Sequence, residues 1–167
     1  MLEAIELMQS TPISIPYNQM ACWSSDSLLN TTPWIHAKLK LVHYLDSAMC
    51  QSCYLQKAVQ YRILFQLEEE TKNEFCNVFI ITPDENVKKK LAIEFYASML
   101  PPTIFVDSTN IFKRVNKNIP SGELYHTFLL DENNNVILVG DPLFNPKIEN
   151  LLISTVNEKL GKGGQKK

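Results

Sequence analysis

The feature that most restricts the fold of this chain is an alternation of strand-like and helix-like patterns through its middle. Residues 39–45, LKLVHYL, form an almost continuous apolar run of strand length, which is typical of a strand buried on both faces. A long helical pattern over 51–73 follows, and then a second buried strand at 78–81 and a helix with Asp84 as its N-cap. Strand, helix, strand and helix in this order predict parallel strands joined by right-handed crossovers.

The pattern changes after residue 100. Three further short strands are predicted, at 103–107, 127–131 and 136–140. The last two flank the turn-forming segment ENNN, which predicts an antiparallel hairpin. A closing helix is expected from Asn145 as N-cap, with Pro146 in its first position, to a stop near Gly161. The sequence therefore predicts an α/β fold with a mixed central sheet.

The two ends of the chain differ from its middle. In residues 1–35 the segment LEAIELM has the pattern of two helical turns, and PISIPY, residues 12–17, alternates like an edge strand. We expect an N-terminal extension, residues 1–35, packed on one domain that spans residues 36–160. Residues 161–167, GKGGQKK, are small, polar and basic, which predicts a disordered tail. A chain of 167 residues is long enough for one sizeable core and short for two.

Charge and hydropathy argue against two classes of partner. The formal net charge is -2 at pH 7 and no basic stripe interleaves with aromatic residues, so we expect no nucleic-acid partner. No apolar run approaches the roughly 18 residues that a membrane-spanning helix needs. The start MLEAIE also lacks the basic and apolar regions of a signal peptide. These observations predict a cytoplasmic protein or one whose leader has been removed.

Two of the four cysteines stand two residues apart, where the first predicted strand gives way to the helical pattern. Cys50 and Cys53 can be a redox pair, half of a metal site or two small buried side chains. A structural zinc site needs four ligands, and the other cysteines and histidines show no second paired spacing, so we predict no metal. Cys76 is expected to be an inert buried thiol. Cys22 can be an exposed thiol, but we expect it to pack within the extension.

The spacing of the pair suits disulfide chemistry. Two residues between cysteines at a helix start let the sulfurs close a short loop, with the first sulfur exposed and the second tucked into the first turn. Cys50 would attack and Cys53 would resolve. The helix dipole stabilises an anion by about 0.3–1 kcal/mol, whereas one pKa unit corresponds to about 1.4 kcal/mol. The helix alone therefore cannot lower a thiol pKa from about 8.5 to 7, and a hydrogen bond from Cys53 or a nearby cation must contribute.

The order of the elements, with the cysteine pair at the first strand-to-helix turn, resembles the thioredoxin fold over about residues 36–160. The resemblance implies a three-layer α/β/α sandwich and thiol-disulfide chemistry without a bound cofactor. Three features are most similar to bacterial cell-envelope proteins of the TlpA/ResA and AhpC/TSA-related type: the N-terminal extension, the insert PPTIFVDSTNIFKRVNKNIP and the segment HTFLLDENNNVILVGDPLFNPKIENLL. Because those proteins are usually exported and often lipid-anchored, the resemblance implies a periplasmic or envelope location and a lipid anchor in the precursor. A cytoplasmic location is the alternative.

The segment YHTFLLD departs from the pattern of this family. The oxidoreductases carry a cis-proline immediately before the threonine of this strand, and His126 stands there, between Tyr125 and Thr127. A cis bond before a non-proline residue costs roughly 2.5–4 kcal/mol, so we expect a trans peptide and a reshaped substrate groove at these three residues. Two interpretations of His126 stay open. Its cationic form can favour the Cys50 thiolate, or it is a partly exposed histidine without a role.

Two other family positions are also changed. Met49 stands where a tryptophan commonly precedes the first cysteine, and we expect it at the surface or the rim of the site. The buried acid of the first core strand is missing, because the equivalent position falls at His43 or Tyr44. We expect His43 to be a core histidine that a neighbour satisfies. Proton transfer to Cys53 would then need another group.

Together these features predict a thiol-disulfide oxidoreductase that acts on protein or peptide disulfides through Cys50 and Cys53. A hypothesis from a different class is a thioredoxin-fold binding module with weak redox turnover, since the cis-proline, the tryptophan and the buried acid are all absent. A peroxiredoxin-like peroxidase is a third possibility. Such an enzyme has Thr or Ser three residues before its reactive cysteine, which Ser47 supplies, and a proline four residues earlier, where His43 stands.

Overall fold

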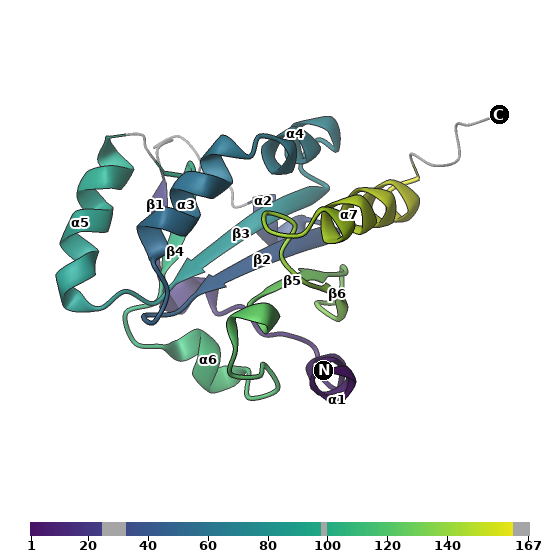
Figure 1. The fold of residues 1–167 in the computed structure, drawn as a ribbon, viewed down its shortest axis with the longest axis horizontal. Helices are drawn as coiled ribbons and strands as arrows, with labels where there is room; N and C mark the ends of the chain where they lie inside the picture. Colours follow the sequence, from purple (N-terminus) through teal and green to yellow (C-terminus); the bar gives the residue numbers. More distant parts are fainter. Residues whose placement is uncertain (25–32, 98–99, 162–167) are drawn as a thin grey trace.

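A computed structural model describes residues 1–24, 33–97 and 100–161 of the chain. A six-stranded mixed sheet with the strand order β1-β4-β3-β2-β5-β6 forms its centre (Figure 1). In chain order the elements are α1 (Leu2–Gln9), the 3-10 helix η1 (Tyr17–Gln19), β1 (Ala21–Ser24), α2 (Pro33–His36), β2 (Leu39–Leu45), α3 (Gln51–Gln60), α4 (Ile63–Glu70), β3 (Phe75–Ile81), α5 (Glu85–Tyr96), β4 (Thr103–Val106), α6 (Ile111–Val115), the 3-10 helix η2 (Glu123–Tyr125), β5 (Thr127–Leu130), β6 (Val136–Val139) and α7 (Pro146–Lys159).

The parallel core of the sheet is confirmed. β2 pairs in parallel with β3 over its whole length, and β3 pairs in parallel with β4. Every residue of β2 and of β3 is buried, as expected for strands that are covered on both faces. β5 pairs antiparallel with β2, and β6 pairs antiparallel with β5, so the predicted hairpin is also confirmed. β2 is therefore an interior strand, and the cysteine pair follows its carboxyl end.

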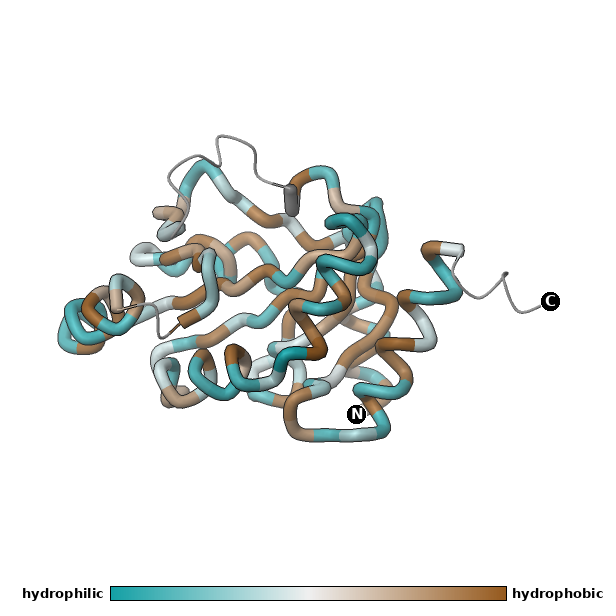
Figure 2. The backbone as a smooth tube through the Cα atoms, turned by 90° about the horizontal axis from the view of Figure 1, so that it is seen from above, coloured by the Kyte–Doolittle hydropathy of each residue, from teal (hydrophilic) through white to brown (hydrophobic). Residues whose placement is uncertain are grey.

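Helices cover both faces of the sheet and make three layers (Figure 1). One hydrophobic cluster joins α3, α4, α5 and α7 to the face that carries Leu41 and Leu45. A second cluster joins α1 and α6 to the opposite face, which carries Val42 and Tyr44. The most hydrophobic stretches of the chain accordingly run through the middle of the molecule (Figure 2). The predicted three-layer α/β/α arrangement is confirmed.

The prediction of one long helix over residues 51–73 is wrong, because the chain breaks between α3 and α4. The Tyr61 amide donates to the carbonyl oxygens of both Lys57 and Ala58, and the backbone leaves the helical conformation there, at φ -89° and ψ 76°. A continuous helix would bury Ile63, whereas after the break Leu64 and Leu67 face the sheet and Ile63 is half-buried. The burial of these two leucines favours two short helices over one straight one.

Both predicted helix caps are present. The Asp84 side chain accepts a hydrogen bond of 2.8 Å from the Val87 amide, and the Asn145 side chain accepts one of 3.0 Å from the Lys147 amide. An N-cap of this kind typically contributes about 1 kcal/mol. The caps fix where α5 and α7 begin and therefore how both helices lie on the sheet.

The N-terminal segment contains a helix where one was predicted and a strand where none was. α1 fits LEAIELM, but PISIPY forms no strand. Pro12 and Pro16 have no amide hydrogen for a ladder, and the Ser14 amide donates instead to the Asn116 side chain at 2.8 Å. The edge strand is β1, which pairs antiparallel with β4. Residues 1–24 therefore contribute a strand to the central sheet, and the division into an extension and a domain stays a prediction. Most of the predicted tail, residues 162–167, lies outside the described residues.

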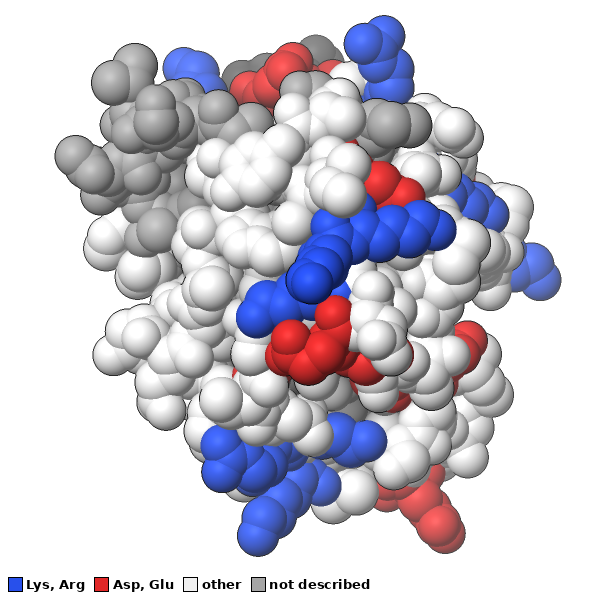
Figure 3. Space-filling view, turned by 90° about the vertical axis from the view of Figure 1, so that its left-hand side faces the viewer, with Lys and Arg blue, Asp and Glu red and all other residues white. Residues whose placement is uncertain are grey.

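The surface features relevant to partners are modest. None of the described helices combines the length and the apolar character that crossing a membrane requires. On the face turned toward the viewer in Figure 3, basic and acidic side chains lie beside one another and much of the surface is uncharged. This face therefore offers no extended basic surface for a nucleic acid.

Candidate active site

The cysteine pair lies at the start of α3, at the carboxyl end of the interior strand β2. Cys50 is the N-cap residue of α3, and its carbonyl oxygen accepts a hydrogen bond of 3.1 Å from the Tyr54 amide. Cys50 and Cys53 form a disulfide, with their Cα atoms 5.4 Å apart. Cys50 is exposed, as predicted. The pair is therefore accessible to a thiol or a disulfide from outside.

Cys53 is also exposed, so the prediction that its sulfur is tucked into the first turn is wrong. The interior side of this turn belongs to Gln51 and Tyr54, of which 3% and 5% are exposed. Leu55 and Ala58 continue this buried face at helical spacing. Cys53 precedes Tyr54 by one residue and lies about 100° away around the helix, on the outer side.

Gln51 attaches the cysteine motif to the ends of two strands, a role that the sequence analysis missed. Its Nε2 atom donates toward the carbonyl oxygens of Leu45 at 3.1 Å, Asp46 at 2.8 Å and Thr82 at 3.0 Å. Leu45 is the last residue of β2, and Thr82 follows β3. The only signal in the sequence is that Gln51 begins the buried series that continues with Tyr54 and Leu55.

The loop before the disulfide is ordered by Asp46. Its side chain accepts a hydrogen bond of 3.0 Å from the Ala48 amide, and its carbonyl oxygen accepts one of 3.3 Å from the Met49 amide. Met49 is half-buried and packs against the hydrophobic cluster that includes α3. This placement fits the expectation of a side chain at the rim, directly before Cys50.

His126 is buried, so the interpretation as a partly exposed histidine is wrong. Only 2% of it is exposed, and its ring meets the edge of the Tyr44 ring with the centroids 5.0 Å apart. Its carbonyl oxygen accepts a hydrogen bond of 2.9 Å from the Tyr44 amide. The peptide bond before it is trans, as expected. Thr127 is likewise buried and Tyr125 half-buried, so a substrate groove at this segment stays a prediction.

The electrostatics of His126 disfavour the cationic form that would support a thiolate. Burial lowers the pKa of its imidazole, and the Asp46 carboxylate, whose Oδ2 lies 3.9 Å from Nδ1, opposes this shift. Because burial is the larger effect, it favours the neutral imidazole and disfavours a positive charge on His126. Its contact with Asp46 connects it instead to the loop that leads to the disulfide.

His43 and Tyr44 lie on opposite faces of β2. His43 is fully buried on the face covered by α3 and stacks on Phe79, with the ring centroids 4.4 Å apart. Its Nδ1 lies 2.8 Å from the Tyr54 hydroxyl and its Nε2 lies 3.1 Å from Asn77 Oδ1. The expectation of a satisfied core histidine is confirmed. Tyr44 lies on the other face, with its hydroxyl 3.3 Å from Asn110 Oδ1.

The other two cysteines do not join the pair. Cys76 is buried, as predicted, and burial raises the pKa of its thiol to about 12. Cys22 is exposed on β1, so the expectation that it packs within the extension is wrong. β1 is an edge strand whose first two residues are both exposed. Among the residues described, no group of three or more His, Cys, Asp or Glu side chains could hold a metal ion.

Solved structures share this architecture, whereas no family model and no curated protein matches the sequence. A thioredoxin-like protein solved in its oxidised form covers 94% of this chain and 98% of its own, at 19% identity and a TM-score of 0.52. The thioredoxin domain of a thiol-disulfide oxidoreductase from Bacteroides vulgatus covers 86% and 100%, at 18% identity and a TM-score of 0.52. A candidate thiol:disulfide interchange protein DsbE from Chlorobium tepidum covers 73% and 82%, at 18% identity and a TM-score of 0.50.

The chain has a thioredoxin-like fold. Identities below 20% carry the fold alone, so the chemistry of this chain has to be argued from its own residues. Within this thioredoxin-like domain, the disulfide, Gln51, the Asp46 loop and His126 lie around the carboxyl end of β2. The membership of a TlpA/ResA-like subgroup stays a prediction.

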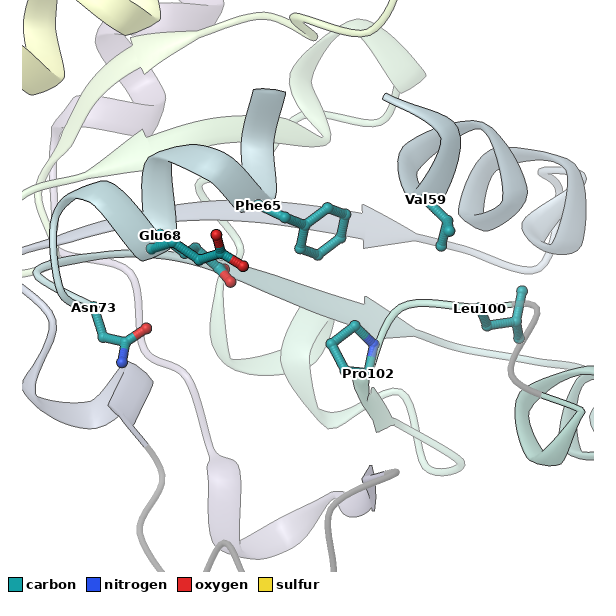
Figure 4. Close-up of a pocket in the computed structure, with 7 residues that line it drawn as sticks. Val59, Phe65, Glu68, Asn73, Leu100 and Pro102 are labelled. Atoms are coloured by element: carbon teal, nitrogen blue, oxygen red, sulfur yellow. The ribbon is translucent and has the colours of Figure 1, made fainter. Parts of the chain in front are cut away.

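A pocket of about 350 Å³ lies elsewhere in the thioredoxin-like domain. Its lining comes from α3, α4 and the segments that precede β3 and β4 (Figure 4): Val59, Phe65, Glu68, Glu69, Asn73, Leu100 and Pro102. Asn73 and Pro102 stand before the starts of the parallel strands β3 and β4, whereas the disulfide follows the end of β2. The pocket therefore lies toward the opposite edge of the sheet and is not part of the disulfide site.

Proposed function

We propose that this protein is a thiol-disulfide oxidoreductase that acts on protein or peptide disulfides through Cys50 and Cys53. The observation that carries the proposal is the exposed disulfide at the first turn of a helix, directly after an interior strand of a thioredoxin-like domain. An accessible disulfide across two intervening residues can exchange with external thiols. The thioredoxin domain of the oxidoreductase from Bacteroides vulgatus shares this fold.

We assign the attacking role to Cys50, because it is the residue at the N-terminus of α3. In the reduced protein, the Cys50 thiolate attacks one sulfur of a substrate disulfide, forms a mixed disulfide and releases a substrate thiolate. The Cys53 thiolate then attacks the Cys50 sulfur, which restores the Cys50–Cys53 disulfide and releases the second substrate thiolate. Two electrons pass from the protein to the substrate, and an external thiol must supply them for the next cycle.

The acidity of Cys50 is expected to be modest. The helix terminus favours the thiolate by about 0.3–1 kcal/mol, which is less than one pKa unit. Burial disfavours the cationic form of His126, so we expect no contribution from this side chain. A hydrogen bond from Cys53 is the remaining contribution, and we expect the reductase rate to rise with pH as the thiolate forms.

The rival proposal of a binding module with weak redox turnover draws on a different observation. The side chains of His126 and Thr127 are buried, and the peptide before His126 is trans, so the segment Tyr125–Thr127 does not have the form that the family uses to hold an extended substrate. Partners of such a module would still be proteins or peptides. A peroxiredoxin-like reaction finds less support, because His43, at the place of the proline, is fully buried in the core.

The location proposed for this protein is the bacterial cell envelope, with a lipid anchor in the precursor. The resemblance of the sequence to envelope proteins supports it. A cytoplasmic location is the alternative. Fractionation of cells that express the full precursor, followed by detection of the protein in each fraction, distinguishes the two locations.

Reduction of insulin by dithiothreitol tests the activity. We expect the wild-type protein to accelerate the precipitation of insulin, and Cys50→Ser to abolish the acceleration. Cys22→Ser is the matched control, because Cys22 is also exposed but belongs to an edge strand. Wild-type turnover no faster than that of free dithiol at equal concentration would exclude the enzyme and leave the binding module.

A further inference from the structure

A short chain of buried polar side chains lies beneath the first turn of α3. Tyr54 Oη is 2.8 Å from His43 Nδ1 and 2.8 Å from Asp141 Oδ2, so it joins a strand residue to the loop after β6. His43 is fully buried, 5% of Tyr54 is exposed, and Asp141 is half-buried at the outer end. A buried chain of this kind must supply a hydrogen atom to every contact that it makes.

Asn77 determines which nitrogen of His43 carries a hydrogen. Its Nδ2 donates to the carbonyl oxygen of Leu64 at 3.0 Å and to Glu68 Oε1 at 2.9 Å. These two acceptors fix the orientation of the amide, so Asn77 Oδ1 faces His43 Nε2 at 3.1 Å. An amide oxygen can only accept, and therefore Nε2 carries the hydrogen.

The remaining contacts need more hydrogens than neutral His43 and ionised Asp141 provide. Nε2 uses the one ring hydrogen of a neutral imidazole, and the Tyr54 hydroxyl can donate either to His43 Nδ1 or to Asp141 Oδ2, but not to both. The contact left over would bring two lone pairs to 2.8 Å. Thr127 Oγ1 lies 3.3 Å from both Tyr54 Oη and Asp141 Oδ2. Its hydrogen stays bonded to Oγ1 and can point at one of these atoms, so it cannot serve as the hydrogen of the contact between Tyr54 and Asp141.

We propose that His43, Tyr54 and Asp141 form a buried site that binds one proton and is linked to the redox state of the Cys50–Cys53 pair. The proton makes Asp141 a donor to Tyr54, or it makes His43 a donor through both nitrogens, and all three contacts are then satisfied. The link passes through α3, because Tyr54 follows Cys53 directly and its amide donates to the Cys50 carbonyl oxygen at 3.1 Å. This second part rests on the proposed function, whereas the proton site does not.

Several titratable and charged groups of the described residues lie around the site. Burial lowers the pKa of His43, with Asp141 and the Asn77 hydrogen bond opposing the shift. Burial and Asp141 raise the pKa of Tyr54, so its hydroxyl keeps its hydrogen. Glu68 lies behind Asn77 on α4, and Lys57 on α3 has its Nζ 3.6 Å from the centroid of the Phe144 ring, which packs near Tyr54. A thiolate formed at α3 on reduction adds a negative charge and favours the bound proton.

NMR of the full chain in its oxidised form tests the proton site. The experiment uses ¹⁵N-labelled histidine and ¹³C-labelled aspartate at pH 7, with His43→Gln and Asp141→Asn to assign the signals. We expect either a protonated Asp141 carboxyl group or a His43 imidazolium, with Nε2 carrying a hydrogen in both cases. An ionised Asp141 together with a neutral His43 overturns the proposal.

Asp141→Asn gives a second test that does not depend on the assignment. The asparagine amide donates to Tyr54 without an added proton and its oxygen still accepts from the Leu143 amide, as Asp141 Oδ1 does at 2.9 Å. We expect the urea midpoint of Asp141→Asn at pH 7 to match that of the wild type. Asp131→Asn is the matched control, because Asp131 Oδ1 accepts from two backbone amides and Oδ2 from the Asn135 side chain, and we expect a lower midpoint. If the urea midpoint of Asp141→Asn falls as far as that of Asp131→Asn, the result contradicts the proton site.

The redox link is tested by following the same NMR signals against pH in the oxidised and reduced protein. We expect the midpoint of proton release to move to higher pH on reduction, and the transition to be absent in Asp141→Asn. Equal midpoints in the two redox states overturn the link. If the protein fails to reduce insulin but the proton is present at pH 7, the proposed function fails while the proton site stands.

Discussion

Replacing Gln51 by methionine tests whether this side chain holds the cysteine motif against the sheet. Methionine keeps the length and the apolar part of the side chain but cannot donate. The Nε2 atom lies within 3.1 Å of three carbonyl oxygens, but it has two hydrogens and makes two full bonds at a time. At about 0.5–1.5 kcal/mol for each bond, the loss is about 1–3 kcal/mol.

Part of this loss is recovered by other donors. The Leu45 carbonyl oxygen also accepts from the Thr82 amide at 2.9 Å, and the Asp46 carbonyl oxygen from the Met49 amide at 3.3 Å. The expected effect is therefore near the middle of the range, about 2 kcal/mol. For a protein of this size it corresponds to a Tm lower by about 4–8 °C.

Urea unfolding of the oxidised protein measures the free energy directly. Ser52→Ala is the matched control, since Ser52 belongs to the same motif and is only half-buried. We expect Gln51→Met to lower the free energy of unfolding by about 2 kcal/mol and Ser52→Ala to lower it by less than about 0.5 kcal/mol. The dependence of the free energy on urea concentration should be unchanged in both variants. Equal stabilities of the two variants would refute the role assigned to Gln51.

Two further predictions concern the backbone and the pH. Gly140 has φ 141°, and an added Cβ would lie 2.8 Å from Ile148 Cδ1. Gly140→Ala should therefore lower the free energy of unfolding by more than about 1 kcal/mol, which thermal melts measure. Gly122→Ala is the control and should change the stability little, because its added Cβ would lie 3.5 Å from Tyr125. Burial lowers the pKa of His126, so the unfolded chain binds more protons than the folded one below about pH 6.5, and stability falls there as the pH falls. His126→Gln should reduce this fall between about pH 7 and 5, and identical pH profiles would contradict it.

Much of the fold was predictable because local patterns and the tertiary structure agree. The apolar run of β2, the caps at Asp84 and Asn145, and the hairpin at ENNN each have a local physical cause that the structure retains. The break between α3 and α4 was not predictable from residues 51–73, which contain neither glycine nor proline. The burial of Leu64 and Leu67 against the sheet decides it, and that is a tertiary effect.

The candidate site was predictable only in part. The spacing of Cys50 and Cys53 indicated a disulfide at a helix start, and the structure contains one. The exposure of Cys53 depends on how α3 is rotated on the sheet, which Gln51 and Tyr54 determine from the interior side. Asp141 could not be identified in advance, because its partner Tyr54 is 87 residues away in the chain.

Intact-mass analysis of Cys53→Ser is the most direct test of the central claim, that Cys50 attacks a substrate disulfide and Cys53 resolves the product. The reduced variant is mixed with a disulfide-bonded peptide, and Cys50→Ser is treated in the same way. We predict that Cys53→Ser accumulates one peptide adduct for each molecule, attached at Cys50, and that Cys50→Ser accumulates none at this motif. The absence of an adduct on Cys53→Ser, or an adduct attached only at Cys22, would contradict the account.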